Sequence, residues 1–295
     1  MWQQLIISPK QNADSDWISD VLSLAGADAV TLRDAQDDPI YEPDLNSTPL
    51  WRQTFIIGLF KQRTQITAAL HLLNQQYPKL PYKIEALHGE DWQQSWQKYC
   101  RPICFNQRLW ICPTWHALPK DDLIKVHLDP GLAFGTGTHP TTAMCIQWLT
   151  EQDLKNKTVI DYGCGSGILA LVAAKLGAKK IFAIDRDPQA LLACRDNAKR
   201  NQIDADQIMT ALPQQCQAIK ADILVANILA NPLIELAPRF VELLKKDGQI
   251  VLSGILSEQS KVVQQCYARW FKLDAPVCQA EWRSLSGTRS RVVTS

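Results

Sequence analysis

The segment DYGCGSG, residues 161–167, places three glycines around a cysteine and a serine. The apolar run KTVI precedes it and ILALVAAKLG follows it, so the segment connects an expected strand to an expected helix. Gly163 and Gly165 allow backbone dihedral angles that other residues avoid, and they allow a ligand to lie close to the backbone. Gly167 is expected to let the helix pack tightly on the strand. The segment therefore predicts a binding site at the carboxyl end of this strand.

A carboxylate stands near the end of the next strand. KKIFAIDRD contains Asp185, 20 residues after Gly165. An acid at this place hydrogen-bonds the ribose hydroxyls of a bound nucleoside cofactor. Asp187, followed by Pro188, has the pattern of a helix N-cap, so we interpret Asp187 as structural and Asp185 as a ligand for ribose. The spacing GxGxG is one residue shorter than the GxGxxG of dinucleotide-binding folds, which leaves a nicotinamide oxidoreductase as the weaker alternative.

The GxGxG loop together with Asp185 resembles the S-adenosylmethionine-dependent methyltransferases of the Rossmann-like class. Their cofactor carries a nucleoside and an amino-acid tail but no pyrophosphate. In that class the methyl group is expected beside Asn227, at the end of the strand ADILVAN. This chain has Asn-Ile-Leu-Ala where amide-directed and adenine-directed enzymes typically have Asn-Pro-Pro-Tyr, so no ring is offered to a planar substrate. The Asn227 carbonyl still accepts a hydrogen bond from an N–H group, which favours a flexible amine as the nucleophile.

A segment rich in glycine, threonine and proline, LDPGLAFGTGTHPTT (128–142), precedes the glycine loop. It is either a long flexible loop or a lid that folds over the cofactor. As a lid it would place Phe134 against an apolar part of the cofactor and let Thr142 donate a hydrogen bond. His139 is a candidate base, although a histidine between threonine and proline more often makes local hydrogen bonds.

The elements that must position these residues alternate between strands and helices from about residue 157 onward. The strands are continuously apolar, as expected when helices cover both faces of a sheet. The pattern predicts a doubly wound α/β sheet that binds its ligand beyond the carboxyl ends of the strands. The tail, FKLDAPVCQAEW followed by RSRVVT, is expected to form a reversed hairpin at the sheet edge.

The first 88 residues have a different pattern, in the order strand–helix–strand–strand–helix–strand. This is the order of a ferredoxin-like α+β domain, an architecture that serves many functions. The loop 34–51 is acidic, which suits a basic partner or is simply a solvated loop. Trp92 and Trp96 lie four residues apart in EDWQQSWQKYC, which predicts a short helical linker over 89–100 before a second domain, 101–295.

Composition restricts the class of protein. Lysine and arginine number 31 and aspartate and glutamate 30, and this balance argues against a dedicated nucleic-acid-binding protein. The nine cysteines include no paired CxxC motifs, so we expect reduced thiols and no metal site, although Cys100, Cys104 and Cys112 are the candidates for one. The N-terminus is not a signal peptide and no apolar run approaches the ~20 residues that span a bilayer. We expect a soluble, cytoplasmic protein.

Six segments, in this order and spacing, resemble the PrmA family of ribosomal protein L11 methyltransferases. They are GEDWQQSWQKYC, RLWICPTW, LDPGLAFGTGTHPTT, VIDYGCGSGILA, AIDRDPQAL and VANILANPL. The glycine motif belongs to a whole superfamily, but the FGTGTHPTT and NILA segments are much more restricted. The match runs from about residue 89 to the end, and the first 88 residues have the right length and predicted topology.

The resemblance implies a class I methyltransferase domain that uses S-adenosylmethionine, an N-terminal domain that binds ribosomal protein L11, and a mobile linker between them. It also implies methylation of lysine ε-amines and the N-terminal α-amine of that protein, up to the trimethylated state. By position, Thr142, Gly163, Asp185 and Asn227 match the family's cofactor contacts. We expect Gly165, in the glycine loop, and Phe134, in the possible lid, to contact the cofactor as well. Asn227 is the residue expected to position the substrate amine.

The expected mechanism is in-line transfer of a methyl group to an uncharged nitrogen. A lysine ammonium with a pKa of about 10.4 has no lone pair at neutral pH, so the site must admit the neutral amine. No strong general base is needed if the proton leaves to water before the transfer, and positioning is then the main catalytic contribution. Alternatives are a methyltransferase acting on rRNA or a small molecule, and a non-enzymatic module that binds RNA or the ribosome. The number and order of target amines, the preference for free or ribosome-bound L11 and the oligomeric state do not follow from the sequence.

Overall fold

The structure is a computed structural model, and it describes residues 2–9, 15–36, 51, 53–87, 101–117, 120–128, 139–216 and 219–290. The chain divides into two compact units, Met1–Tyr99 and Cys100–Ser295. Each unit has hydrophobic core clusters of its own. The predicted linker 89–100 and most of the acidic loop 34–51 lie outside the described residues.

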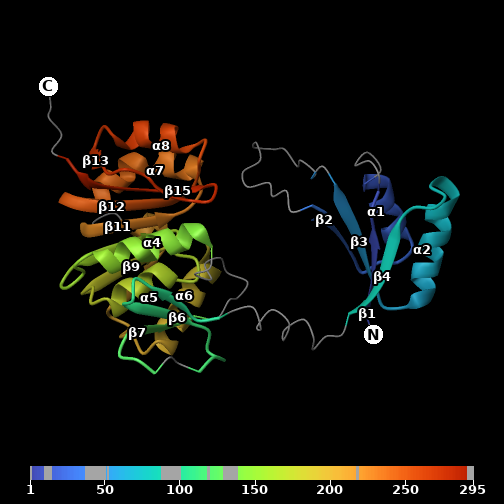
Figure 1. Ribbon diagram of the computed structural model, residues 1–295, viewed down its shortest axis with the longest axis horizontal. Coiled ribbons are helices and arrows are strands. Elements are labelled where there is room, and N and C mark those ends of the chain that lie inside the picture. Colours follow the sequence, from blue (N-terminus) through green and yellow to red (C-terminus); the bar gives the residue numbers. More distant parts are fainter. Residues whose placement is uncertain are drawn as a thin grey trace. The chain divides into compact units, whose positions relative to one another are not determined.

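The first unit is an antiparallel sheet in the order β2-β3-β1-β4 with two helices packed on one face (Figure 1). Apolar side chains alternate along the central strands, so Leu5 and Ile7 of one strand and Ile56 and Phe60 of another lie in the core beneath the helices. The elements follow the order that the sequence predicts. They are β1 (Trp2–Ile7), α1 (Ser15–Leu24), β2 (Ala29–Asp34), β3 (Thr54–Phe60), α2 (Arg63–Gln76) and β4 (Tyr82–Leu87).

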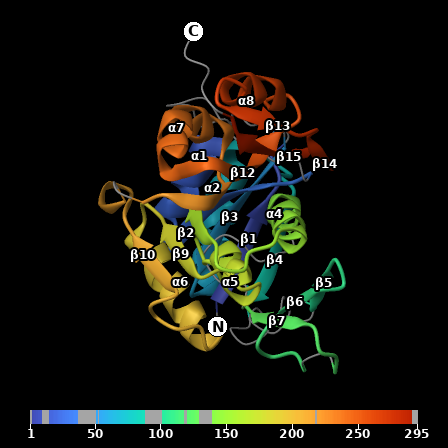
Figure 2. The same cartoon turned by 90° about the vertical axis from the view of Figure 1, so that its left-hand side faces the viewer.

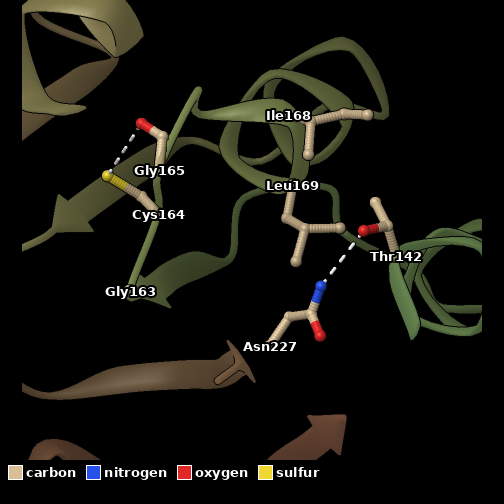
Figure 3. Close-up of a pocket in the computed structure, with 7 residues that line it drawn as sticks. All are labelled: Thr142, Gly163, Cys164, Gly165, Ile168, Leu169 and Asn227. Atoms are coloured by element: carbon tan, nitrogen blue, oxygen red, sulfur yellow. Dashed lines mark hydrogen bonds between the residues drawn. The ribbon is translucent and has the colours of Figure 1, made fainter. Parts of the chain in front are cut away.

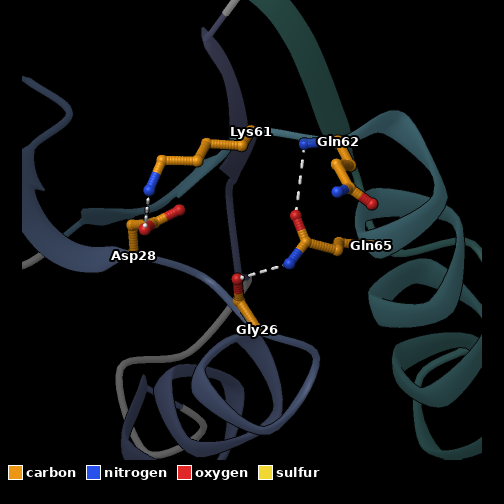
Figure 4. A network of polar contacts seen from close by, with 5 residues as sticks. All are labelled: Gly26, Asp28, Lys61, Gln62 and Gln65. Atoms are coloured by element: carbon orange, nitrogen blue, oxygen red, sulfur yellow. Dashed lines mark hydrogen bonds and ion pairs between the residues drawn. The ribbon is translucent and has the colours of Figure 1, made fainter.

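Polar contacts join the end of α1 to the start of α2 (Figure 4). Gln65 donates from Nε2 to the carbonyl oxygen of Gly26 at 3.0 Å, and its Oε1 accepts from the backbone N–H of Gln62 at 3.2 Å. Lys61 Nζ lies 2.8 Å from Asp28 Oδ1, but both side chains are exposed enough that water screens the pair. The glutamine therefore does most to hold the turn after α1 against the second helix.

The second unit is built on a sheet in the order β10-β9-β8-β11-β12-β15-β13, with β14 paired to β15. The five strands from β10 to β12 run parallel, and β15 pairs antiparallel with β12, β13 and β14. The bounds are β8 (Thr158–Tyr162), β9 (Lys180–Ile184), β10 (Ile208–Ala211), β11 (Ala221–Asn227), β12 (Leu244–Leu256), β13 (Phe271–Leu273), β14 (Val277–Gln279) and β15 (Trp282–Arg289).

Helices cover both faces of this sheet (Figure 1 and Figure 2). One face packs against α4 (Pro140–Glu151), α5 (Ile168–Lys175) and α6 (Pro188–Arg200), and the other against α7 (Ala230–Leu243) and α8 (Ser260–Tyr267). Neighbouring residues of one strand, Val159 and Ile160, are buried in opposite cores, which explains why the strands read as continuous apolar runs. Because β8 lies between β9 and β11, the carboxyl ends of these three parallel strands are adjacent.

Two elements of the second unit are not predicted by the sequence pattern. The strand β10 has only four residues, and the helix α4 begins inside the stretch that we interpreted as a loop or lid. The His139 side chain accepts a hydrogen bond from the backbone N–H of Thr141, and Pro140 occupies the first turn. These two residues start a helix within a segment whose composition is typical of a loop.

The last strand of the described residues is β15, which the sequence pattern does not predict, and most of the predicted strand RSRVVT (289–294) lies outside the described residues. The reversed direction of β15 is as predicted. Several buried positions of β15 carry small residues, Ser284 and Gly287, beside the apolar Trp282 and Leu285. The apolar alternation of a half-buried strand is therefore weak in the sequence.

A separate three-stranded sheet opens the second unit, with the strands β5 (Ile103–Phe105), β6 (Leu109–Cys112) and β7 (Ile124–His127). Asn201, at the end of α6, accepts from the backbone N–H of His127 and donates to its carbonyl oxygen, both at 2.7 Å. Within the segment RLWICPTW, 108–115, residues Leu109–Cys112 form the central strand of this sheet. In the part of the chain that the structure describes, no helix is long and apolar enough to cross a membrane.

Candidate active site

The glycine loop connects β8 to α5 and has a conformation that favours glycine at three places. Gly163, Gly165 and Gly167 have φ angles of 78°, 51° and 83°. A Cβ atom on Gly163 would lie 2.3 Å from Cγ2 of Ile228, which follows β11. A Cβ atom on Gly167 would lie 2.4 Å from Sγ of Cys194 on α6. The absence of a side chain at Gly167 thus permits close approach of a second helix, α6, a contact that the sequence does not predict.

Asp185 lies directly after β9 and contacts this loop. Its Oδ2 accepts from the backbone N–H of Gly165 at 2.9 Å, and its Oδ1 accepts from the backbone N–H of Asp187 at 3.0 Å. Asp185 thus has a structural role that the sequence analysis did not anticipate. Each carboxylate oxygen has more than one lone pair, and the side chain is partly exposed, so the same group can accept further hydrogen bonds from a ligand.

Asp187 has the structural role that the sequence predicts. Its Oδ1 accepts from the backbone N–H of Gln189 at 2.8 Å, and Pro188 follows it in the first turn of α6. The two aspartates, two residues apart, therefore divide into one that caps a helix and one that holds the glycine loop.

Asp161 lies beneath the loop, at the end of β8, and only 1% of its surface is exposed. Its Oδ2 accepts from the backbone N–H of Ala170 in α5 at 3.0 Å, whereas its Oδ1 is buried without a hydrogen-bond partner. Burial raises the pKa of Asp161 to about 7, and the negative charge of Asp185 acts in the same direction. In the sequence, Asp161 is the first residue of the segment DYGCGSG, and nothing in the local pattern indicates its burial.

Asn227, at the end of β11, meets Thr142 across the site. The Asn227 side chain donates from Nδ2 to Oγ1 of Thr142 at 3.1 Å, as Figure 3 shows. Thr142 is fully buried in the first turn of α4, and so it lies on a helix instead of in the predicted lid. No described residue donates to the other side-chain atom of Asn227, its carbonyl oxygen Oδ1, which is therefore available to accept a hydrogen bond.

A cavity brings these predicted residues together (Figure 3). Besides Thr142, Gly163, Gly165 and Asn227, three side chains that the sequence analysis did not single out line it: Cys164, Ile168 and Leu169. A hydrogen bond with Cys194 and burial raise the pKa of the Cys164 thiol, so it stays protonated. The pattern GCGSGIL holds all three positions, and their contact with the cavity follows from the tight turn that the glycines permit.

Two predicted residues of the segment 128–142 are not part of this group. Phe134 lies outside the described residues. His139 is the N-cap of α4, with Nδ1 2.7 Å from Oγ1 of Thr141 and its ring at an edge contact with Trp282. Burial lowers the pKa of His139, and the carboxylate of Glu281 opposes this shift. The structure supports the interpretation of His139 as a residue that makes local hydrogen bonds.

No group of three or more histidine, cysteine, aspartate or glutamate side chains able to hold a metal ion occurs within the described ranges. Cys104 is partly buried and Cys112 is buried, both with free thiols, and Cys100 lies outside those ranges. The cavity is thus lined by backbone, apolar side chains and two neutral polar groups, with one carboxylate at its loop.

Comparison with known proteins places this site in a family. The sequence profile described as ribosomal protein L11 methyltransferase (PrmA) matches residues 1–290. Proteins named ribosomal protein L11 methyltransferase from Shewanella putrefaciens and Pseudomonas syringae pv. tomato are 47% and 48% identical over 293 and 292 residues, 98% of this chain and 99% of each relative. A crystal structure of ribosomal protein L11 methylase from Lactobacillus delbrueckii subsp. bulgaricus matches with a TM-score of 0.60 and 35% identity, over 65% of this chain and all of that one.

These matches confirm the α/β fold of a class I methyltransferase. The relatives match this chain over nearly its whole length, so the likeness is not confined to the glycine motif. The chain belongs to the PrmA family of ribosomal protein L11 methyltransferases.

Proposed function

We propose that this protein transfers methyl groups from S-adenosylmethionine to lysine ε-amines and the N-terminal α-amine of ribosomal protein L11, up to the trimethylated state. The observation that carries the proposal is the hydrogen-bonded pair Thr142–Asn227, which faces the glycine loop across one cavity. Membership in the PrmA family supports the choice of L11 as the substrate.

The residues of the cavity suit this cofactor. Gly163 and Gly165 both line the cavity, so a ligand there would contact the backbone of the glycine loop, while the missing side chain of Gly163 leaves room for Ile228. Asp185 would hold the ribose hydroxyls while keeping its bond to Gly165, and Thr142, Gly163, Gly165 and Asn227 would line the rest of the binding site. Phe134, in the segment before α4, is proposed as an additional apolar contact. When bound, the cofactor supplies an electrophilic methyl group on a positively charged sulfur.

The side chain of Asn227 is suited to receive an amine. Because its Nδ2 donates to Thr142, the amide is oriented and its Oδ1 can accept an N–H of the neutral amine in the first and second transfers. The neutral dimethylated amine has no N–H, so the third transfer does not use this hydrogen bond. The residues that follow, Ile228 and Leu229, offer no aromatic ring to stack on a planar base. This arrangement favours a flexible lysine side chain or an N-terminal amine over a nucleobase.

Positioning supplies most of the catalysis in this proposal. The substrate ammonium loses its proton to water before the transfer, because a site that excludes water and holds a positive sulfur lowers the pKa of the amine. His139 is not required as a base, since it caps α4 and burial lowers its pKa. Holding the two reacting atoms in line can supply on the order of 7–11 kcal/mol of the barrier reduction.

The two units would then have separate tasks. We assign recognition of L11 to residues 1–88, as a ferredoxin-like domain, and catalysis to residues 101–295, with the segment 89–100 as the linker. The strand order β2-β3-β1-β4 supports the first assignment. We place the reaction in the cytoplasm, with L11 free or in the large subunit as the partner and without strong direct binding to nucleic acid.

The test is incubation of the purified full-length protein with methyl-labelled S-adenosylmethionine and a mixture of unmodified ribosomal proteins and rRNA. Label should appear in L11, on lysine ε-amines and the α-amine, as mass spectrometry of its peptides would show. Label in rRNA, or in no macromolecule, would contradict the proposal and favour an RNA or small-molecule methyltransferase.

A further inference from the structure

The strand β12 approaches the Asn227 turn at a residue without a side chain. Gly254 has a φ angle of 84°. A Cβ atom built on it would lie 2.4 Å from the carbonyl oxygen, 2.9 Å from the carbonyl carbon and 3.3 Å from the nitrogen of Ile228. Real Cβ atoms essentially never come within 3.0 Å of another atom, so this contact requires glycine. The backbone of Ile228 thus rests directly on the backbone of β12.

Ile228 is also in contact with the cofactor loop. Its Cγ2 lies 2.3 Å from the position that a Cβ atom on Gly163 would take, so a side chain there would overlap with it. The residue next to Asn227 therefore lies between two bare Cα atoms, one in the glycine loop and one in β12. Its side chain contacts the glycine loop and its backbone contacts β12.

The residue before Gly254 holds the other side of the site. Ser253 is fully buried, pairs with Asn227 across the parallel strands, and donates from Oγ to the carbonyl oxygen of Thr141 at 3.0 Å. Ser253 thus contacts the chain that carries Thr142, and Gly254 contacts the chain that carries Asn227. Two consecutive residues of one strand support both partners of the Thr142–Asn227 hydrogen bond.

We infer that Gly254 is a positioning residue for methyl transfer, which sets the place of the Asn227–Ile228 backbone and through it the amide that receives the substrate amine. The inference rests on the proposed function. A side chain at position 254 must move the Ile228 peptide by about 1 Å to restore ordinary contact, because such contacts begin at 3.4 Å. A misplacement of about 1 Å at a reacting group can lower the rate about 100-fold.

The experiment compares Gly254→Ala with Gly177→Ala in the full-length protein. Gly177 has a φ angle of 99°, and a Cβ atom there would have nothing within 4 Å, so this control introduces a similar backbone strain without a steric contact. At saturating S-adenosylmethionine and L11, kcat of Gly254→Ala should fall about 10- to 100-fold. Gly177→Ala should keep kcat. Thermal unfolding should report a larger destabilisation for Gly254→Ala, because only that variant adds a steric overlap, so kcat is compared at a temperature at which both variants are folded.

Gly254→Asn serves if Gly254→Ala does not fold, because asparagine tolerates a positive φ angle better than alanine while it still presents a Cβ atom. A kcat within about twofold of the unsubstituted protein, an equal loss in Gly177→Ala, or a loss that disappears at saturating substrates would each overturn the inference.

A second measurement separates this inference from the proposed function. If the unsubstituted protein labels no L11, the proposed function fails, but the side-chain amide resonance of Asn227 can still be followed by NMR. It should shift in Gly254→Ala and stay in place in Gly177→Ala. An unchanged resonance in Gly254→Ala would overturn the positioning role.

Discussion

Asp185 combines two contacts that a substitution can separate, one with the glycine loop and one with the proposed ribose. Replacing it with alanine removes a charged acceptor, and hydrogen bonds to charged groups contribute about 1.5–3 kcal/mol each. We therefore expect Asp185→Ala to raise the Kd for S-adenosylmethionine at least tenfold, as isothermal titration calorimetry would measure. Asp185→Asn, which can still accept from Gly165, should have a smaller effect.

Asp187 offers the matched control, because it lies two residues away and caps α6 without contact to the loop. Asp187→Ala should lower the free energy of unfolding by about 1 kcal/mol, the usual cost of a lost N-cap, and leave the Kd nearly unchanged. Equal effects of the two alanine substitutions on the Kd would refute the assignment of Asp185 to the ribose.

Asp161 makes the stability of the protein depend on pH. Burial raises its pKa to about 7, whereas an unfolded aspartate has a pKa of about 3.9. Below about pH 4 both states carry the proton and this group has no effect. Between about pH 4 and pH 7 the unfolded state loses its proton first, so stability falls as the pH rises, and the full loss is present above about pH 7.

Asp161→Asn should remove this dependence, because the amide does not ionise. The free energy of unfolding of the variant minus that of the unsubstituted protein should increase by about 2–3 kcal/mol from pH 5 to pH 8, as denaturant titration would measure. Asp196→Asn, an exposed substitution on α6, provides the control and should show no such trend. If Asp161→Asn changes the free energy of unfolding by the same amount at pH 5 and at pH 8, the raised pKa of Asp161 is contradicted.

At the scale of elements, α8 is joined to α7 by a buried hydroxyl. Tyr267 is fully buried, and its hydroxyl donates to the carbonyl oxygen of Leu233 at 2.6 Å. Burial raises the pKa of Tyr267, so the hydroxyl is protonated and remains a donor at neutral pH. Tyr267→Phe should cost about 1–3 kcal/mol in free energy of unfolding, because it leaves a buried carbonyl without this partner. The exposed Tyr82→Phe should change little, and an equal effect of both would contradict a structural role for the bond.

The sequence predicts the elements whose pattern is strong and local. β8, β9 and β11 are mostly apolar, and an aspartate followed by proline starts α6, so the sequence predicts these four elements and the structure confirms them. β10 is too short to show a period, and the buried Ser284 and Gly287 interrupt the apolar pattern of β15. α4 starts where the His139 side chain accepts from the backbone N–H of Thr141. The glycine, threonine and proline around His139 are typical of a loop, so the sequence did not indicate this helix start.

The same limit applies to the site. Gly163 and Asp185 lie within motifs that can be read along the chain, and Asn227 ends a recognisable strand. Ser253 and Gly254 were not predicted, because their role depends on the register of β12 against β11. The sequence carries no local signal of that register, since the paired stretches Leu224–Ala226 and Ile250–Leu252 are both continuously apolar.

At the scale of the whole molecule, the two units have separate cores and should respond separately to core substitutions. Leu22 is fully buried in the core of the first unit and Leu224 in that of the second. Leu→Ala changes in a core cost about 2–5 kcal/mol. Leu22→Ala should therefore weaken methylation of L11 while the Kd for S-adenosylmethionine stays the same, and Leu224→Ala should raise that Kd.

Calorimetric scans and binding titrations on both full-length variants would check this difference. Leu22→Ala should lower one thermal transition and Leu224→Ala another. An equal rise of the cofactor Kd in both variants would show that the stability of one unit depends on the core of the other.

The position of Ile228 between Gly163 and Gly254 also limits which substitutions such an enzyme can accept during evolution. Its side chain contacts Gly163 and its peptide contacts Gly254. The proposed binding of the methyl donor and the proposed positioning of the acceptor amine therefore both depend on Ile228. A drift at any of these three places disturbs both halves of the reaction together. If residues 1–88 recognise the substrate as proposed, new substrate preferences are more readily acquired there, because variation in that unit leaves the contacts of Ile228 unchanged.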